Sequence, residues 1–332
     1  MTPTHDIEDD QRFQRPRRRT RPRTKDRPSH LDAVEGFVMT IDRGRYTLRV
    51  RGPDGELTVT AMTARALGRK AVVVGDRVRV VGDVSGAEGT LARIVEVTER
   101  TTALRRTADD DDPVERIIVA NADQLVIVTA VANPEPRPRL IDRALVAAYD
   151  EGLDPLLCLT KVDLADPAEL LATYRPLGVT SVVAPRGGDL EPMRDALRDR
   201  VSVFLGHSGV GKSTLVNALV PGALRATGDV NVVTGRGRHT STSAWALELP
   251  FGGWVVDTPG IRSFGLAHVD PRHLIGAFED LDAVTADCPR GCTHASTEPE
   301  CALDVAMEHG QIDRARVESF RRLLDSRSAS ER

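Results

Sequence analysis

Nine consecutive residues have the types and the spacing of a phosphate-binding loop. Residues 206–214 read Gly-His-Ser-Gly-Val-Gly-Lys-Ser-Thr, which satisfies G-x-x-x-x-G-K-[ST] at every fixed position. Such a loop surrounds a phosphate chain with backbone N–H groups and ends at a helix N-terminus, whose partial positive charge attracts phosphate. Lys212 is expected to reach the β- and γ-phosphates, and the Ser213 hydroxyl to ligate Mg²⁺. The residues expected to bind a nucleoside triphosphate are Gly206, His207, Ser208, Gly209, Val210, Gly211, Lys212, Ser213 and Thr214.

The neighbouring sequence favours this interpretation over a simple glycine turn. Residues 201–205 form an apolar run typical of a buried strand, and residues 214–220 read as a helix. A strand that leads into the loop and a helix that leads out of it are the context in which the pattern binds phosphate.

A second motif indicates which base is bound. Residues 160–163 read Thr-Lys-Val-Asp, which fits the guanine-reading pattern [NT]-K-x-D. The Asp163 carboxylate would accept hydrogen bonds from the ring N1–H and the exocyclic amine of guanine, whereas adenine offers no such donor pair. The stem of Lys161 would pack along the flat face of the base. We therefore expect the base to be bound by Thr160, Lys161, Val162 and Asp163.

Two observations strengthen this short pattern. Lysine is rare, because only four of the 45 lysine and arginine residues are lysines, namely Lys25, Lys70, Lys161 and Lys212. A lysine kept where arginine serves elsewhere suggests a need for a compact ammonium on a straight stem. The motif also follows an apolar run at 156–159, so it falls at the carboxyl end of a strand, where open α/β sheets bind ligands.

A third motif, Asp-Thr-Pro-Gly at 257–260, follows a strand-like run at 253–256. It fits D-x-x-G, in which Asp257 would reach Mg²⁺ through water and the Gly260 amide would bond the γ-phosphate. By itself the tetrapeptide is also an ordinary Pro-Gly turn. Its position downstream of the phosphate-binding loop favours the functional interpretation.

The order of the three motifs is unusual. In ordinary GTPases the guanine motif comes last, but here it precedes the phosphate-binding loop, and no lysine follows Lys212 to form a later copy. If the original termini of such a domain are joined and its chain is cut at an exposed loop, the core stays intact. The sequence therefore predicts a circularly permuted GTPase domain whose D-x-x-G segment leads directly into the C-terminal part of the chain.

That C-terminal part carries a metal-binding pattern. Cys288, Cys292, His294 and Cys301 read C-x3-C-x-H-x6-C. Three thiolates and an imidazole at short spacing suit tetrahedral Zn²⁺ in a closed, structural site. The alternatives are free thiols or a disulfide, and disulfides are rare in the cytosol, where we expect a chain without an evident signal peptide or membrane span. We expect the fourth cysteine, Cys158, to be a buried core thiol.

The first thirty residues differ from the rest in charge. They hold nine basic and five acidic residues, a charge of +4, so the remainder carries −8 within the net charge of −4. Because residues 1–30 are poor in apolar side chains and rich in Pro and Arg, we expect a disordered basic arm. Such an arm suits nucleic-acid phosphates, although a purely solvating tail is the plainer alternative.

The next segment, 31–100, is expected to form a small barrel. Five strand-like runs separated by turn residues predict an OB-fold; they lie at 34–41, 46–50, 57–60, 78–81 and 91–97. Four arginines of this segment would either track phosphates or form a solvated face, namely Arg43, Arg45, Arg49 and Arg51.

The predicted fold class is multidomain. An N-terminal OB-fold β-barrel is followed by a linker at 101–114, a central circularly permuted α/β P-loop GTPase domain at 115–270 and a C-terminal zinc-binding helical domain at 271–332. Strands are expected at 117–121 and 125–131, and helices at 140–149 and 304–324.

This combination resembles the ribosome small-subunit-dependent GTPase A family (RsgA, also called YjeQ) over about residues 34–325. Besides the phosphate-binding loop and the metal ligands, the matching segments are Val-Gly-Asp-Arg-Val at 74–78, Ala-Asn-Ala-Asp-Gln-Leu at 120–125, Gly-Arg-His-Thr at 237–240 and Asp-Thr-Pro-Gly-Ile-Arg at 257–262. The resemblance implies a GTPase that acts late in 30S subunit maturation. Such a protein would bind near the decoding centre, contact 16S rRNA and leave after GTP hydrolysis.

The chain departs from the family pattern in three places. Thr160 stands where the family usually has Asn, so one hydrogen bond of the amide is lost and guanine affinity should fall. Val183 and Ala184 occupy the place of a Ser-Ala pair in the second guanine loop. The family spacing C-x4-C-x-H-x5-C is shifted by one residue on each side, a change that the chelate should survive.

We expect the catalytic residues to be His239, Lys212, Thr240 and Thr242. Ile261 occupies the position at which ordinary GTPases carry a water-orienting Gln, so the isolated protein should hydrolyse GTP slowly. A neutral His239 would position water once the 30S subunit orders the switch segment, or it would only contact rRNA. Thr240 or Thr242 would close over Mg²⁺.

The expected function is hydrolysis of GTP to GDP and phosphate, stimulated by the 30S subunit, in late maturation of that subunit. The alternative is an rRNA-binding assembly factor that uses GTP only as a regulatory ligand; a metabolite kinase is disfavoured by Asp163 and the metal pattern. We expect a cytoplasmic monomer that binds GTP or GDP with Mg²⁺, one structural Zn²⁺, the 30S subunit and 16S rRNA, and no membrane.

Overall fold

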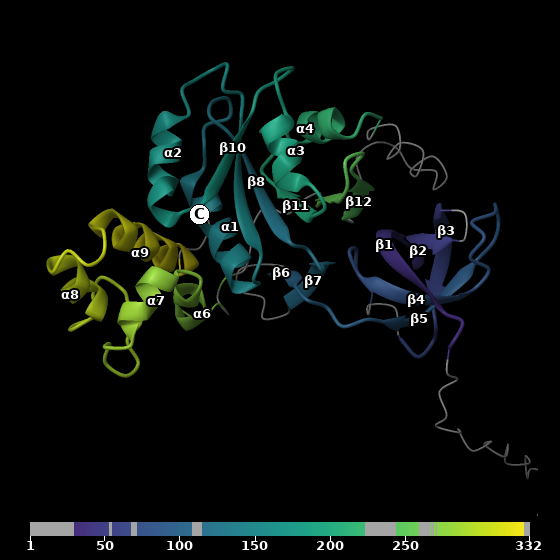
Figure 1. Cartoon of the computed structure of the whole chain (residues 1–332), viewed down its shortest axis with the longest axis horizontal. Coiled ribbons are helices and arrows are strands. Elements are labelled where there is room, and N and C mark those ends of the chain that lie inside the picture. The colour runs from purple at the N-terminus through teal and green to yellow at the C-terminus, as the bar shows by residue number, and fades with distance from the viewer. Residues whose placement is uncertain are drawn as a thin grey trace, which may run out of the picture. The chain divides into compact units, whose positions relative to one another are not determined.

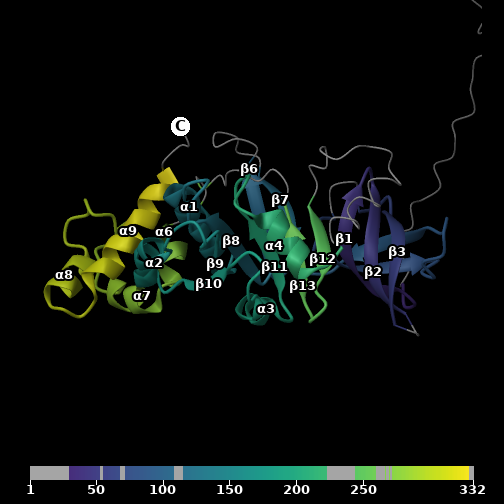
Figure 2. The same cartoon turned by 90° about the horizontal axis from the view of Figure 1, so that it is seen from above.

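A computed structural model describes most of the chain (Figures 1 and 2). The described residues are 30–52, 55–67, 72–107, 115–222, 244–258, 266, 269 and 271–328. The described residues from Asp32 onward belong to one compact unit. Within the described residues, no helix has the length and apolar character needed to cross a membrane.

The N-terminal part of the described chain is a closed five-stranded barrel. Its strands are β1 (Val34–Asp42), β2 (Arg45–Gly52), β3 (Gly55–Thr63), β4 (Arg77–Gly82) and β5 (Ala92–Val97). They pair in the order β1-β2-β3-β5-β4, and β4 returns to β1. Alternation along β2 buries Tyr46, Leu48 and Val50 in the barrel core. The predicted five-stranded barrel is thereby confirmed.

The central part is a mostly parallel sheet with helices on both faces. Its strand order is β10-β9-β8-β11-β13-β12, and only β12 is antiparallel to its neighbour. The strands are β8 (Gln124–Ala130), β9 (Asp154–Thr160), β10 (Thr180–Ala184), β11 (Val201–Leu205), β12 (Trp245–Glu248) and β13 (Trp254–Asp257). The helices are α1 (Pro138–Asp150), α2 (Ala168–Tyr174) with the 3₁₀ turn η2 (Arg175–Leu177), α3 (Glu191–Leu197) and α4 (Lys212–Leu219).

Strand β8 shows why the sheet is covered on both sides. Leu125 and Ile127 belong to one buried cluster, while Val126 and Val128 belong to another. Because successive side chains of a strand point to opposite faces, a continuous apolar run needs a packed layer on each.

The chain between barrel and sheet also has regular structure. Strands β6 (Ala103–Thr107) and β7 (Glu115–Ala120) form a separate two-stranded ribbon, so β6 occupies part of the segment expected to be a linker. The close approach of the chain at Gly75 to Ala120 of β7 requires a glycine, because a Cβ at this position would lie 2.0 Å from the carbonyl oxygen of Ala120. The Asn121 side chain donates to the Gly75 carbonyl (3.0 Å) and accepts from the Thr101 amide (2.9 Å).

The C-terminal part consists of α6 (Pro271–Gly276), α7 (Glu279–Thr285), α8 (Ala302–Glu308) and α9 (Arg314–Ser328). The prediction of a single helix over 304–324 is therefore wrong. Gly310, at φ +67°, ends α8, and the Asp313 carboxylate accepts from the Ala315 amide to start α9. Residues 308–311, Glu-His-Gly-Gln, interrupt the apolar spacing, so the helix-ending glycine was a signal in the sequence that the prediction missed.

Candidate functional site

The phosphate-binding loop lies at the carboxyl end of β11, between that strand and α4. Gly206 passes so close to β8 that a Cβ there would lie 2.4 Å from the Val128 carbonyl oxygen. Gly209 and Gly211 have positive φ angles of +86° and +99°, which side chains rarely adopt, and Gly211 is the N-cap of α4. The fixed glycines of the pattern are thus required by the backbone path, and they leave Lys212 and Ser213 in the first turn of the helix.

Thr160 connects the guanine motif to this loop. Its hydroxyl lies 2.5 Å from the carbonyl oxygen of Val210 and 3.2 Å from that of Thr129. It also faces Gly211, whose added Cβ would meet the Thr160 side chain at 3.7 to 3.9 Å. The hydrogen bond to Val210 joins the end of β9 to the loop after β11.

The other three residues of the guanine motif, 161–163, have side chains in three different environments. Lys161 has a φ of +56°, and its ammonium donates to the carbonyl of Asn133, in the loop between β8 and α1. Val162 packs against the larger buried cluster of the sheet, whereas Asp163 is exposed. Sequence analysis missed Asn133, because a backbone carbonyl can act at any residue and leaves no signal in the side-chain types.

The D-x-x-G strand lies beside the phosphate-binding strand. Phe204 of β11 is paired with Asp257 of β13, so both motifs leave the sheet at the same edge. The ammonium of Lys212 lies 3.2 Å from a carboxylate oxygen of Asp257. Thr258 is buried, and its hydroxyl donates to the Phe204 carbonyl (3.3 Å). Two residues expected at the phosphates and Mg²⁺ are therefore within reach of each other.

His207 adds a neutral imidazole to the loop. Its Nδ1 lies 3.1 Å from the Ser208 carbonyl, which assigns the proton to that nitrogen. Burial lowers the pKa of His207, and the nearby charges of Arg137 and Lys161 act in the same direction against the carbonyl contact. These effects favour the neutral form of the ring.

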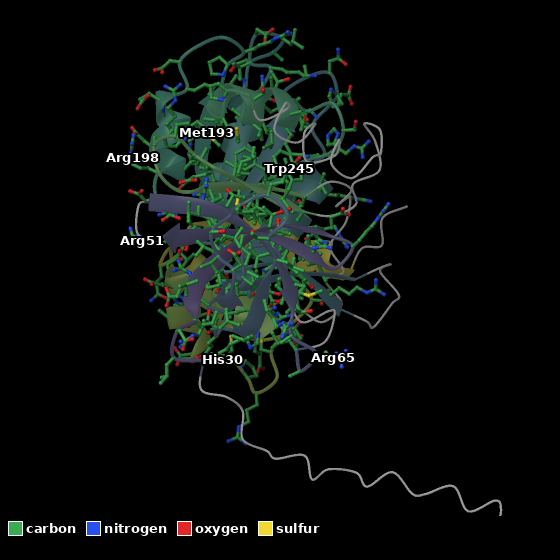
Figure 3. The ribbon with its side chains drawn as sticks, turned by 90° about the vertical axis from the view of Figure 1, so that its right-hand side faces the viewer. His30, Arg51, Arg65, Met193, Arg198 and Trp245 are labelled. Carbon is green, nitrogen blue, oxygen red and sulfur yellow. The ribbon has the colours of Figure 1, made fainter. Side chains whose placement is uncertain are left out.

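Several predicted residues lie outside the described part of the chain. These are His239, Thr240, Thr242, Gly260 and Ile261. Of the four barrel arginines, Arg43, Arg45 and Arg51 are exposed, and Figure 3 shows Arg51 at the periphery of the barrel. Arg49 instead contacts Glu248 of β12 and donates to Thr58.

The predicted metal ligands form one compact cluster. The ligand atoms of Cys288, Cys292, His294 and Cys301 all lie within 4.8 Å of one another. Nδ1 of His294 is 3.6, 3.6 and 3.9 Å from the sulfurs of Cys288, Cys292 and Cys301. Zn–S bonds of about 2.3 Å and a Zn–N bond of about 2.0 Å at tetrahedral angles require N···S separations of about 3.6 Å. The cluster therefore fits a single tetrahedral metal ion.

The surroundings of the cluster suit metal binding. Amide groups of His294 and Ala302 donate to the sulfurs of Cys292 (3.4 Å) and Cys288 (3.3 Å), which stabilises thiolate charge. Burial raises the pKa of Cys288, and it raises that of Cys292 to about 11, so a strong cation is needed to hold these sulfurs as thiolates. Arg321 of α9 donates to the His294 carbonyl (3.0 Å) and pairs with Asp304.

The chain is similar to known proteins over most of its length. The family model described as RsgA GTPase matches residues 97–267. A small ribosomal subunit biogenesis GTPase RsgA from Chlorobaculum parvum is 40% identical over 309 residues, covering 89% of this chain and 98% of that relative. YjeQ from Thermotoga maritima matches with a TM-score of 0.67 and 28% identity, covering 90% of this chain and 100% of that one.

A second solved structure has the same fold. YloQ, described as a circularly permuted GTPase, matches with a TM-score of 0.64 and 23% identity over 92% of this chain and 99% of that one. The circularly permuted fold expected from the motif order is thereby confirmed.

Proposed function

The chain belongs to the RsgA GTPase family, and we propose that it hydrolyses GTP while bound to the small ribosomal subunit, during late maturation of that subunit. The observation that carries this proposal is the convergence of three motifs at one edge of the sheet. Thr160 contacts the carbonyl of Val210, and Lys212 contacts Asp257. The proximity of residues at the carboxyl ends of β9 and β13 to the loop after β11 supports binding of a single nucleotide.

We assign the nucleotide contacts from this arrangement. The loop residues 206–214 would cradle the phosphates, and Lys212 would exchange its contact with Asp257 for the β- and γ-phosphate oxygens. Ser213 and Asp257 would hold Mg²⁺, which neutralises charge that develops on the phosphates. Asp163 is exposed and therefore accessible to the donor edge of guanine, and Lys161, fixed at Asn133, would lie along the base.

The phosphoryl-transfer step needs a group that orients water. Ile261 lacks a hydrogen-bonding side chain, so we assign this role to His239, with Thr240 or Thr242 closing over Mg²⁺. These residues would act only after the 30S subunit orders their segment, so we expect slow hydrolysis by the protein alone. We therefore place the 30S subunit and 16S rRNA among its partners.

The remaining assignments follow from the same reasoning. Zinc is the metal that best suits three thiolates and one imidazole at tetrahedral separations, and its role would be structural. A role in the maturation of ribosomal subunits supports a cytoplasmic location, where we expect the protein to act as a monomer. The exposed barrel arginines and the basic arm at 1–30 are candidates for contact with rRNA phosphates.

The proposal is tested by measuring phosphate release from GTP with and without purified 30S subunits, with ATP as the control nucleotide. We expect 30S subunits to raise GTP turnover at least about tenfold, a change of about 1.4 kcal/mol in barrier height, and ATP to remain uncleaved. GTP binding without turnover, even with 30S subunits, would instead favour the regulatory-ligand alternative. Turnover of ATP with a small-molecule acceptor would indicate a kinase.

A substitution at His239 tests the proposed activation. His239→Ala should retain GTP affinity but lose 30S-stimulated turnover by about 100-fold, which is typical for removal of a general base or water-positioning group. Pelleting with 30S subunits provides the control for binding. Full stimulated turnover in the variant would show that the imidazole has no catalytic role, whereas loss of pelleting would assign it to subunit binding.

A further inference from the structure

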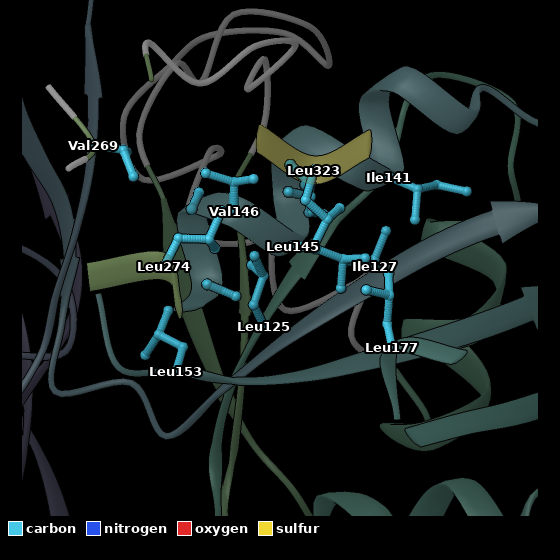
Figure 4. Close-up of a cluster of buried hydrophobic side chains, with 14 of the residues drawn as sticks. Leu125, Ile127, Ile141, Leu145, Val146, Leu153, Leu177, Val269, Leu274 and Leu323 are labelled. Atoms are coloured by element: carbon cyan, nitrogen blue, oxygen red, sulfur yellow. The ribbon is translucent and has the colours of Figure 1, made fainter. Parts of the chain in front are cut away.

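Helix α9 completes the hydrophobic core beneath the guanine motif. Val317, Phe320, Leu323 and Leu324 of α9 are buried in the same cluster as Ile141 and Leu145 of α1. Figure 4 shows Leu323 next to Leu145. Val162, which lies between the two proposed base-reading residues, packs against this cluster as well. The C-terminal helix and the guanine motif therefore share one packed core.

A single arginine of α9 also makes polar contacts with both neighbouring helices of the GTPase domain. Nε of Arg322 lies 3.3 Å from a carboxylate oxygen of Asp142, on α1. Its guanidinium stands over the ring of Tyr174, 5.3 Å from the centroid, and Nη2 donates to the Thr173 carbonyl (3.4 Å) at the end of α2. Asp142 and Tyr174 are only 3% and 2% exposed, so this guanidinium is the charge partner of an almost fully buried carboxylate.

Helices α1 and α2 are the two elements that flank the guanine motif. Helix α2 follows residues 160–163 within a short connection, and α1 follows the loop that contains Asn133. The carbonyl of Asn133 is the acceptor for the Lys161 ammonium. A shift of α1 relative to α2 would therefore move the support of Lys161 relative to Asp163.

We propose that Arg322 is a positioning residue for base recognition: by holding α1 and α2 together from α9, it fixes Lys161 and Asp163 at the spacing that guanine requires. This inference rests on the proposed guanine site. Without Arg322, Asp142 would lose its charge partner, and α9 would lose this side chain's polar contacts with both α1 and α2. The C-terminal segment would then contribute to nucleotide selectivity as well as to metal binding.

The test compares the affinities of full-length variants for GDP and IDP. Inosine lacks the exocyclic amine that Asp163 would read, so the ratio of the two dissociation constants reports the placement of that carboxylate. We expect Arg322→Gln to weaken GDP binding about tenfold and IDP binding less, which lowers the ratio. Turnover at saturating GTP should stay within about twofold of the wild-type value, because the phosphate-binding loop is not changed.

Arg314→Gln is the matched control, because Arg314 lies on the same helix with 68% of its side chain exposed and should leave both affinities unchanged. If Arg322→Gln does not fold by circular dichroism, the isosteric Asp142→Asn is measured in the same way. A folded variant with an unaltered GDP-to-IDP ratio overturns the inference. A wild-type protein that does not prefer GDP to ADP would instead contradict the proposed guanine site itself.

Discussion

At the level of single residues, the guanine motif depends on contacts that its four letters do not specify. The Thr160 hydroxyl reaches the Val210 carbonyl, and the Lys161 ammonium reaches the Asn133 carbonyl. Asp163 is left exposed beside Leu164, which is itself 53% exposed. One member of the motif thus supports the phosphate-binding loop, another is held by a neighbouring loop, and the carboxylate remains accessible to the base.

The role of Asp163 predicts a change of base preference. Asp163→Asn replaces one acceptor with an amide donor, which suits the 2-carbonyl of xanthine and opposes the 2-amine of guanine. GTP affinity should fall by about 100-fold, or about 2.7 kcal/mol, while XTP affinity should rise. Competition of GTP, XTP and ATP for a fluorescent nucleotide measures this. If the variant binds GTP with the same affinity as the wild-type protein, Asp163 does not contact the base.

At the level of secondary-structure elements, the junction of barrel and sheet is as specific as the nucleotide site. Gly75 lies against Ala120 of β7. The Asn121 side chain donates to the Gly75 carbonyl and accepts from the Thr101 amide. The buried Asp76 carboxylate pairs with Arg100 at 2.7 Å. The segments at 74–78 and 120–125, which matched the family, therefore serve at least partly to join two parts of the chain.

A pair of glycine substitutions separates steric contact from backbone strain at this junction. Gly75 and Gly44 have similar φ angles, +88° and +81°, but a Cβ at Gly44 would meet nothing within 4 Å. Gly44→Ala should cost about 1 kcal/mol from φ alone. Gly75→Ala should cost at least about 3 kcal/mol, because the Ala120 carbonyl must also move. Thermal unfolding measures both, and equal losses would show that the close approach carries no cost.

Helix α9 is also held to α7 by an ion pair with a defined pH dependence. The hydrogen bond from Arg316 lowers the pKa of Asp280 below its ordinary value of 3.8, against a smaller opposing effect of burial. Because the folded-state pKa is depressed, the stabilisation is complete above the ordinary value and is lost as the pH falls through the lowered one.

Asp280→Asn should therefore reduce Tm at neutral pH and have no effect in strong acid. The Asp280 side chain is 50% exposed, so solvent screening limits the loss to less than about 1 kcal/mol. Unfolding followed from about pH 7 to about pH 2, with the exposed Glu279→Gln as control, measures it. A difference that persists in acid would assign the effect to packing.

The metal cluster should account for much of the order of the C-terminal helices. Purified protein is expected to contain about one Zn²⁺ per chain, and Cys301→Ser should lose it together with several degrees of Tm. Metal content by atomic emission and thermal unfolding report the two effects. Cys158→Ala is the control, since Cys158 lies in β9 away from the cluster and should keep the metal.

At the level of the whole molecule, the sheet of the GTPase domain continues into the barrel. Strand β12 pairs with β13 on one side and meets β1 at Thr40 and Trp245 on the other. Phe37 of β1 stacks on Trp254 of β13, with ring centroids 4.6 Å apart. Since β12 directly follows the segment that contains His239, the barrel contacts the strand that leaves the proposed switch.

The strongest sequence predictions concerned features that are local in the chain. The phosphate-binding loop, the strands on either side of it and the four metal ligands could be read from spacing, because turn geometry and chelation depend on nearby residues. The five barrel strands were recovered from alternation and turn residues. The helix predicted over 304–324 failed at Gly310, a helix-ending residue in the polar stretch 308–311 that the prediction did not take into account.

From the sequence alone, the order of the motifs predicted the circularly permuted fold, and residues 160–163 predicted guanine as the base. Tertiary structure was needed to bring Lys212 to Asp257, Lys161 to Asn133, and Arg322 to Asp142 across 180 positions. The physical reason is that backbone acceptors and buried charge partners are chosen by proximity in the folded core. Residue type alone therefore cannot identify them before the core is assembled.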